Sequence, residues 1–322
     1  MNAKQLRNNL LLMLAALIWG TAFVAQSVGS GYVGPYTFLA VRSWMACLFL
    51  GGLMAVLAKL RKYHPTHPTV PEDKKLLLIG GGLCGIMLFA ASAAQQSAMS
   101  GVSAAKASFL TALYVVLVPV VGVFVGRRPG ARIWACVGVS VVGLYLLCLA
   151  GKGAAGGLSG SEWLLLLCAL LFCFQILLVG HFSPRMDGVK LSFMQFLTTA
   201  VLSTVCMFLF ERPDPVALRG AMFSIVYCGI FSSGIAYTLQ IVGQRGLEPA
   251  IASLAMCLES VFGAVAGWII LGETLTPVET LGCVLMFGAI VAAQLPGRRG
   301  KLQKTGDAAT VPALNGQDAD GD

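Results

Sequence analysis

The sequence predicts an all-α polytopic membrane protein with ten transmembrane helices in two inverted five-helix repeats. Of its 322 residues, 57% are hydrophobic and 11% are charged, whereas a soluble domain carries about a quarter charged residues. The apolar residues gather in ten runs close to the length of about 20 that crosses a bilayer core. This composition excludes a soluble enzyme and a nucleic-acid-binding protein.

Each apolar run should be α-helical, because backbone amides in hydrocarbon must be satisfied within their own segment. The first run follows Lys4 and Arg7, as in a signal peptide, but nine further runs follow it. We therefore interpret it as the first membrane helix. GPY opens the second run, and GRRPG closes the fourth. The five helices of the first half are predicted approximately over 9–28, 36–58, 76–98, 104–125 and 133–150.

The second half supplies another five helices. LEPA opens the ninth apolar run, and LTP precedes the tenth. These five helices are predicted approximately over 163–180, 191–210, 221–242, 249–271 and 278–295. An external linker over 151–162 joins the repeats, which span 9–150 and 163–295. Residues 1–8 form a short N-terminal tail, and residues 296–322, with few bulky apolar side chains, are expected to be a disordered tail.

Basic residues predict the orientation in the membrane. With the N-terminus inside, seventeen of the 22 Lys and Arg residues fall on the cytoplasmic side, four fall outside, and Arg42 lies within the second helix. Short cytoplasmic loops carry an excess of Lys and Arg. We expect a multi-pass protein of the plasma membrane with both termini in the cytoplasm.

An internal repeat relates the two halves. The stretch LCGIMLFAASAAQQSAMSGVSAAKASFL, from Leu83, aligns without gaps to YCGIFSSGIAYTLQIVGQRGLEPAIASL, from Tyr227. LAALIWG, from Leu14, likewise meets LCALLFC, from Leu167. Halves with an odd number of helices insert in opposite orientations. Inverted repeats are typical of secondary transporters, whose substrate site lies near the bilayer centre between the halves.

Four motifs in order carry a family resemblance: LxxLAALIWGTAFVAQ, YTFLAVRSW, KASFLTALYVVLVPVVGVFVGRRP and SLAMCLESVFGAVAGWIILGETLTPVETLGCVLMFGAIV. From about Asn9 to Gln294 the chain resembles the drug/metabolite transporter (DMT) superfamily, specifically its EamA-type members. The resemblance implies a ten-helix, two-repeat transporter whose relatives export amino acids, other small metabolites or drugs. Where the family often has LEP in the ninth helix, this chain has Leu258, Glu259 and Ser260. We expect the missing proline to stiffen that helix.

Glu259 is the first candidate for the transport site. It lies about 14 Å along the ninth predicted helix at 1.5 Å per residue, near the bilayer centre. A carboxyl group there is energetically costly and usually functional. Burial favours its protonated form, so a proton that leaves and returns could drive transport. The alternative is a neutral acid that serves packing through a hydrogen bond to a neighbouring helix.

Three further side chains are candidates for contact with substrate or ion. Arg42 lies too deep in the second helix for a simple surface charge, so it either binds a substrate carboxylate, reaches the interface by snorkelling, or pairs with an acid. Tyr114 falls almost opposite Glu259 in the repeat alignment, where its hydroxyl could donate to substrate or acid. Trp19 could form one wall of a cavity. For both aromatic residues, core packing is the alternative.

Four residues are candidates for gates or helix contacts. Gln96 and Gln240 are repeat-related polar groups which, with Tyr237, are expected close to opposite membrane faces. Pro119 removes a backbone donor and is expected to bend the fourth helix in its inner half.

The predicted function is secondary active transport, by alternating access, of a small-molecule substrate. Export and proton coupling are favoured, and import by the same fold is an alternative. An intramembrane enzyme acting on lipids is a second alternative, but such chemistry generally needs clustered acids, histidines or a metal. We expect no enzymatic activity, cofactor, metal or nucleic-acid partner. Membrane lipids surround the protein, and it is either a monomer or a homodimer.

Overall fold

The ten predicted segments are all helical in the structure, a computed structural model. It describes residues 3–63, 73–102, 104–127, 129–148, 159–271 and 276–294. Within these ranges every regular element is a helix. Eight of the described helices are long and apolar enough to cross a membrane, and two shorter apolar helices, Ala131–Leu147 and Pro277–Ala293, account for the remaining predicted spans. The prediction of an all-α membrane protein is confirmed.

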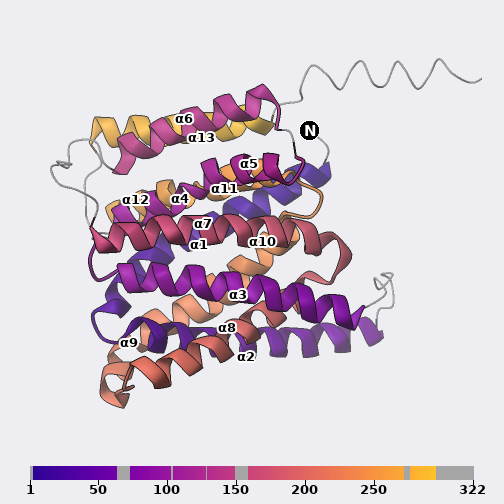
Figure 1. Cartoon of the computed structure of the whole chain (residues 1–322), viewed down its shortest axis with the longest axis vertical. Coiled ribbons are helices and arrows are strands. Elements are labelled where there is room, and N and C mark those ends of the chain that lie inside the picture. The colour runs from indigo at the N-terminus through magenta and orange to yellow at the C-terminus, as the bar shows by residue number, and fades with distance from the viewer. Residues whose placement is uncertain are drawn as a thin grey trace, which may run out of the picture.

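The first half contains four continuous segments and one interrupted segment (Figure 1). α1 (Ala3–Ser30), α2 (Pro35–Tyr63) and α3 (Lys74–Ala98) are the first three. The fourth is divided at Leu113 into α4 and α5, and α6 follows. The bounds of these three helices are Ala104–Ala112, Tyr114–Phe124 and Ala131–Cys148.

The second half contains two segments that depart from a regular α-helix. α7 (Gly160–Phe182) passes through a short 3-10 turn, η1 (Ser183–Arg185), to α8 (Gly188–Phe210). The eighth segment consists of α9, a π-helical stretch η2 and α10, with bounds Pro215–Tyr227, Cys228–Ala236 and Tyr237–Gly243. The ninth is divided into α11 and α12, and α13 is the tenth, with bounds Pro249–Met256, Glu259–Leu271 and Pro277–Gln294.

Polar caps mark where several helices begin. Asp73, Asp187 and Asp214 each accept hydrogen bonds from backbone amides in the first turn of α3, α8 and α9. Ser159 and Glu162 form a reciprocal capping box at the start of α7. These side chains satisfy amides that have no partner within their own helix.

Helix packing is symmetric under exchange of the two halves. α1 packs against the third and fourth segments of the second half, which are α9, η2 and α10 and then α11 and α12. Its counterpart α7 packs against the third and fourth segments of the first half, which are α3 and then α4 and α5. α2 packs against its own counterpart α8, and α6 against α13. In Figure 1 the α6–α13 pair lies at one edge of the bundle and the α2–α8 pair at the opposite edge. The two predicted repeats therefore interlock in the folded chain.

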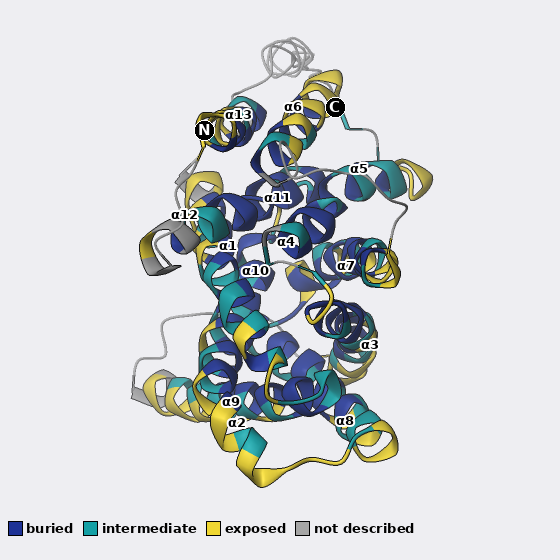
Figure 2. Cartoon of the chain, turned by 90° about the vertical axis from the view of Figure 1, so that its left-hand side faces the viewer, coloured by how far each residue is buried: buried dark blue, intermediate teal, exposed yellow. Residues whose placement is uncertain are grey.

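Buried residues concentrate in the middle of the bundle, and exposed residues lie on its outer faces (Figure 2). Exposed apolar residues such as Leu48, Phe124 and Phe223 are expected on a surface that faces lipid tails. The largest cluster of buried apolar residues is built from helices of both halves.

The bundle has two ends, which we name after the residues near them. The Ser30 end contains the C-terminus of α1, and the Ser183 end contains η1. At the Ser183 end Asn8 donates to the carbonyl oxygen of Arg245, whose guanidinium donates to the carbonyl oxygen of Met186. Both described ends of the chain lie at the Ser183 end in Figure 1. An even number of spans requires this arrangement.

Candidate functional site

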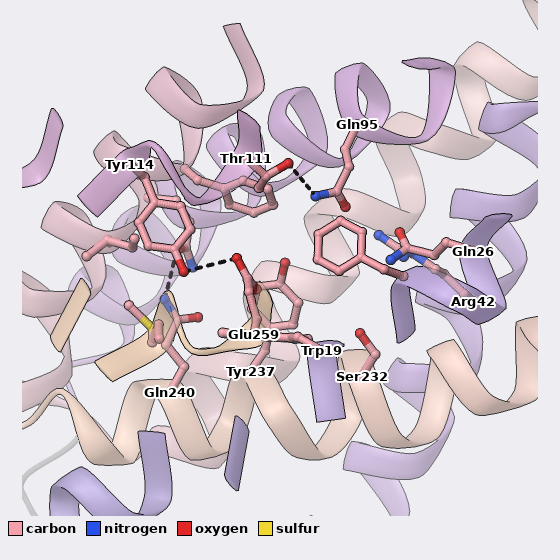
Figure 3. A pocket seen from close by; sticks show the side chains of 15 residues that line it. Trp19, Gln26, Arg42, Gln95, Thr111, Tyr114, Ser232, Tyr237, Gln240 and Glu259 are labelled. Carbon is pink, nitrogen blue, oxygen red and sulfur yellow. Dashed lines mark hydrogen bonds between the residues drawn. The ribbon is translucent and has the colours of Figure 1, made fainter. Parts of the chain in front are cut away.

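A cavity lies between the two halves of the chain (Figure 3). Both halves contribute polar and aromatic side chains to its wall. Those of the first half include Trp19, Gln26, Arg42, Gln95, Thr111 and Tyr114. Those of the second half include Phe172, Gln175, Ser232, Tyr237, Gln240 and Glu259. The four residues predicted to contact substrate or ion thus line one cavity.

One hydrogen bond between the halves in this cavity joins Tyr114 and Glu259. The Tyr114 hydroxyl donates to Glu259 Oε1 at 3.1 Å, and both residues are buried. Each is the first residue after the interruption of its helix, because the fourth segment breaks at Leu113 and the ninth breaks at Cys257 and Leu258. Repeat-related breaks therefore bring together two side chains that lie one position apart in the repeat alignment.

The interruption of the ninth segment differs from the stiff helix expected there. Ser253 Oγ donates to the Ala250 carbonyl oxygen at 2.9 Å, and Cys257 Sγ donates to the Leu254 carbonyl oxygen at 3.1 Å. The Ser260 amide then bonds back three residues to Cys257. Side chains that bond local carbonyl oxygens compete with the regular helix ladder. The Ser253 hydroxyl and the Cys257 thiol thus accompany this break, which forms without a proline.

Pro119 does not coincide with the interruption of the fourth segment. That break is at Leu113, six residues earlier, and α5 runs through Pro119, which is buried. Pro119 is also outside the set of cavity-lining residues. The predicted bend and gate role at Pro119 remain predictions, whereas the observed break positions Tyr114.

A glycine holds α1 against the backbone beside Glu259. A Cβ atom at Gly20 would lie 2.6 Å from the Glu259 carbonyl oxygen and 2.6 Å from the Gly263 amide nitrogen. These distances are shorter than van der Waals contact, so only glycine allows this approach. The close crossing places Trp19 in the cavity wall next to the acid (Figure 3).

Arg42 faces the interior of the bundle. Its side chain is 3% exposed, Nη1 donates to Gln26 Oε1 at 3.0 Å, and the guanidinium lies 5.8 Å from the centroid of the Phe38 ring. Nε has no hydrogen-bond partner. Snorkelling to the interface is inconsistent with this burial. Glu259 and Arg42 lie on different sides of the cavity rather than as an ion pair (Figure 3).

Aromatic rings support the wall near the acid. Trp19 and Tyr237 meet edge to face with centroids 4.8 Å apart, and Tyr237 meets Phe196 in the same manner at 5.3 Å. Trp19 Nε1 is buried and has no acceptor. Trp19 therefore combines the two roles considered for it, since it packs and also presents a free donor at the cavity.

The three other predicted gate residues are buried, but two of them reach the cavity. Tyr237 and Gln240 line it, and Gln240 Nε2 donates to Gln175 Oε1 at 3.1 Å. Gln96 Nε2 donates to the backbone carbonyl of Gln26 at 3.3 Å. The sequence indicates how far each residue lies along its helix, but it does not indicate which neighbours the side chain meets.

Sequence reasoning missed several polar members of the wall. Gln26, Gln95 and Gln175 lie within apolar helices, and Gln95 Nε2 donates to Thr111 Oγ1 at 3.3 Å. A glutamine in a membrane span is itself a signal, because an amide is costly to bury without a partner. Reading every intramembrane glutamine as a site candidate would have found all three.

The described residues contain no cluster of three or more His, Cys, Asp or Glu side chains that could hold a metal ion. Nine of the cysteines in the described part of the chain are free thiols. Among the described residues, the wall of the cavity therefore offers hydrogen-bonding groups, one carboxyl group and one guanidinium.

Comparisons with known proteins agree with this architecture. The profile of the EamA-like transporter family matches residues 6–149 and 160–293. An uncharacterised transporter of Archaeoglobus fulgidus is 27% identical over 91% of this chain and 87% of its own length. The threonine/homoserine exporter RhtA of Escherichia coli is 28% identical over 54% of this chain and 57% of its own length. A solved crystal structure superposes with a TM-score of 0.70 at 22% identity and covers 91% of this chain and 98% of that one.

Proposed function

Because the chain belongs to the EamA-like transporter family, we propose that it is a proton-coupled exporter of small zwitterionic metabolites such as amino acids. Membership is established by the family match to both halves, which makes the protein a multi-pass membrane transporter of the DMT superfamily. The substrate, the direction and the coupling ion are the proposal. The observation that supports it best is the buried carboxyl of Glu259 in a cavity shared by both halves.

The cavity offers separate partners for the two charges of a zwitterion. Arg42 has an unpaired Nε and could bind a carboxylate, for which a guanidinium is well suited. Glu259 lies across the cavity and could accept from an ammonium group (Figure 3). The relative RhtA is named as a threonine/homoserine exporter, which agrees with this class of substrate.

Proton coupling follows from the chemistry of an acid in a low-dielectric cavity. Binding an ammonium requires the carboxylate, and the carboxylate without a cation is costly at this depth. A proton from the opposite side can neutralise Glu259 on the return step, so the acid carries either substrate or proton. Tyr114 donates a hydrogen bond to the carboxyl group and thereby orients it for both.

Flux through reconstituted protein tests this proposal. Proteoliposomes loaded with a mixture of labelled amino acids would be placed in a buffer of lower external pH. We expect accelerated loss of one or a few amino acids, and no acceleration when an ionophore collapses the pH difference. Unchanged flux with and without the gradient would contradict proton coupling, and accelerated uptake of external amino acid under the same gradient would indicate proton-coupled import.

Localisation in the plasma membrane with both termini in the cytoplasm is part of the proposal. A relative from Escherichia coli that is 22% identical over 87% of this chain is named as an inner membrane transporter. The excess of Lys and Arg in the loops of one side supports the orientation.

A further inference from the structure

The helices form two blocks that each mix the repeats. The first block contains α1, α2 and the eighth segment (α9, η2 and α10), and the second contains α7, α8 and α3. Backbone-close contacts bind each block. A Cβ at Gly229 would lie 3.0 Å from the Arg42 carbonyl oxygen, and a Cβ at Gly85 would lie 2.6 Å from the Gln195 carbonyl oxygen. These two contacts are repeat-related, so each third helix is anchored in the block of the other half.

Two buried glutamines make hydrogen bonds from one block to the other. Gln96 on α3 donates to the Gln26 carbonyl oxygen on α1 at 3.3 Å. Gln240 on α10 donates to Gln175 Oε1 on α7 at 3.1 Å. Gln96 and Gln240 are repeat-related, and both are almost fully buried. The two donors are thus equivalent, although one bonds to a backbone carbonyl and the other to a side-chain amide, and the bonds link the blocks in opposite directions.

These cross-block bonds lie toward opposite ends of the cavity. Gln26 and Gln96 are near the C-termini of α1 and α3, at the Ser30 end. Gln175 and Gln240 are in the C-terminal parts of α7 and α10, which lead to the Ser183 end. Gln26 and Gln175 also line the cavity, so each bond joins the two blocks beside the cavity on the side of one end of the bundle.

A third residue completes each network. Arg42 on α2 donates to Gln26 Oε1 at 3.0 Å, and Gln175 donates to Gln195 Oε1 on α8 at 3.4 Å. Arg42 and Gln195 have the same separation in the sequence as Leu14 and Leu167, so they are also repeat-related. We name the networks the Ser30-end triad (Gln26, Arg42, Gln96) and the Ser183-end triad (Gln175, Gln195, Gln240).

Both triads carry the same unsatisfied atom. The side-chain oxygens of Gln96 and Gln240 are buried and have no hydrogen-bond partner. A buried acceptor without a donor raises the free energy of the state that buries it. Opening either end to water would satisfy the acceptor at that end, which partly offsets the loss of the cross-block bond.

We propose that Gln96 and Gln240 are the positioning residues of two gates, and that the Ser30-end and Ser183-end triads close opposite ends of the cavity in alternation. The inference rests on the proposed transport function and adds the residues that control access. Other contacts also join the blocks, such as the packing of α2 against α8 and, at the Ser183 end, the hydrogen bond from Gln244 to the Ile176 carbonyl oxygen at 3.5 Å. Each triad adds one cross-block hydrogen bond at its own end, so breaking that bond favours opening there. The blocks rock as units, and the opposite end then closes more firmly.

Hydrogen–deuterium exchange of the full chain in lipid nanodiscs tests the gates without substrate or pH gradient. Gln96→Met and Gln240→Met keep the side-chain shape but remove the amide. We expect Gln96→Met to raise exchange at the Ser30 end and to lower it at the Ser183 end. Gln240→Met should do the opposite. The expected change is about fivefold, the population shift that corresponds to one lost hydrogen bond.

A matched control separates gating from local loosening. Thr199 on α8 donates to the Gly85 carbonyl oxygen on α3 at 3.1 Å, inside the second block. Thr199→Val should change exchange only near these helices. If a methionine variant does not fold, Gln→Asn at the same position shortens the reach of the amide and serves instead. Raised exchange at both ends, or no change at the far end, would overturn the gates.

The outcome is independent of the coupling mechanism. If the flux assay shows no proton dependence but the two variants show reciprocal changes in hydrogen–deuterium exchange, the gates stand and the proposed function is rejected. Flux with normal pH dependence but without reciprocal exchange would reject the gates alone.

Discussion

At the residue scale, the site consists of polar groups whose hydrogen-bonding capacity is only partly used. Glu259 accepts from Tyr114, while Arg42 Nε and Trp19 Nε1 have no acceptor. Buried polar groups in proteins are normally paired. Unpaired donors around a cavity are therefore the feature that distinguishes a binding site from a packed polar core.

Replacing Glu259 with Gln should abolish the pH dependence of transport while the protein still inserts. The amide keeps the shape and can accept from Tyr114, but it carries no titrating proton. The measurement is proteoliposome flux as a function of external pH. Unchanged pH dependence in this variant would exclude Glu259 as the proton carrier.

Glu248 provides the control for that measurement. It is a half-buried acid in the loop before α11, where burial raises its pKa and Arg127 partly opposes the effect. It therefore also titrates above the usual range of a glutamate, but it lies outside the cavity wall. Glu248→Gln should leave the pH profile of flux unchanged.

Arg42→Gln should weaken the binding of substrates that carry a carboxylate. A charge-assisted hydrogen bond to a buried partner contributes about 1.5–3 kcal/mol, so KM should rise by roughly 10- to 150-fold. The corresponding amino-acid amides, which lack the carboxylate, should show little change. Equal weakening for both substrate series would indicate that Arg42 only maintains the structure.

At the element scale, broken helices decide the geometry of the cavity. The fourth and ninth segments are interrupted at repeat-related positions, which places Tyr114 and Glu259 at the start of α5 and α12. The eighth segment contains the π-helical stretch Cys228–Ala236, next to the cavity residue Tyr237. Irregular backbone at membrane depth is tolerated where it is enclosed by protein or lines a cavity.

Gly20→Ala should destabilise the crossing of α1 and α12. The added Cβ would meet the Glu259 carbonyl oxygen and the Gly263 amide at 2.6 Å. Overpacking of this kind costs about 1–3 kcal/mol, which a shift in the unfolding transition in detergent would report. Gly82→Ala on α3, where a Cβ meets nothing within 4 Å, is the matched control. Equal stability of the two variants would contradict the close crossing.

At the scale of the whole molecule, two interlocked halves create a cavity with similar polar networks toward each end. Each half provides two helices to one block and a third to the other. Exchange of the halves maps Gln96 on Gln240 and Arg42 on Gln195. A structure of this kind has two related ways of opening, and alternating access uses both.

Both termini should be reached only from the cytoplasm. Protease sites fused to either end should be cleaved in inside-out vesicles and protected in right-side-out vesicles, because the basic loops remain inside. Cleavage of the two ends from different sides would be incompatible with an even number of spans. Cleavage of both ends from the outside would show that the protein has the opposite orientation in the membrane.

The sequence by itself determined the fold class, the ten helical segments and the repeat. These features follow from the thickness of the bilayer and from the need to satisfy backbone amides within each segment. Only the tertiary structure decided that Tyr114 bonds to Glu259, that Gln240 meets Gln175, and that the ninth segment breaks without a proline. The sides of a membrane helix that face lipid and protein are both apolar, so hydrophobic periodicity does not orient its polar side chains. Their partners are set by the rotation and close approach of helices at positions such as Gly20, which depend on residues far apart in the chain.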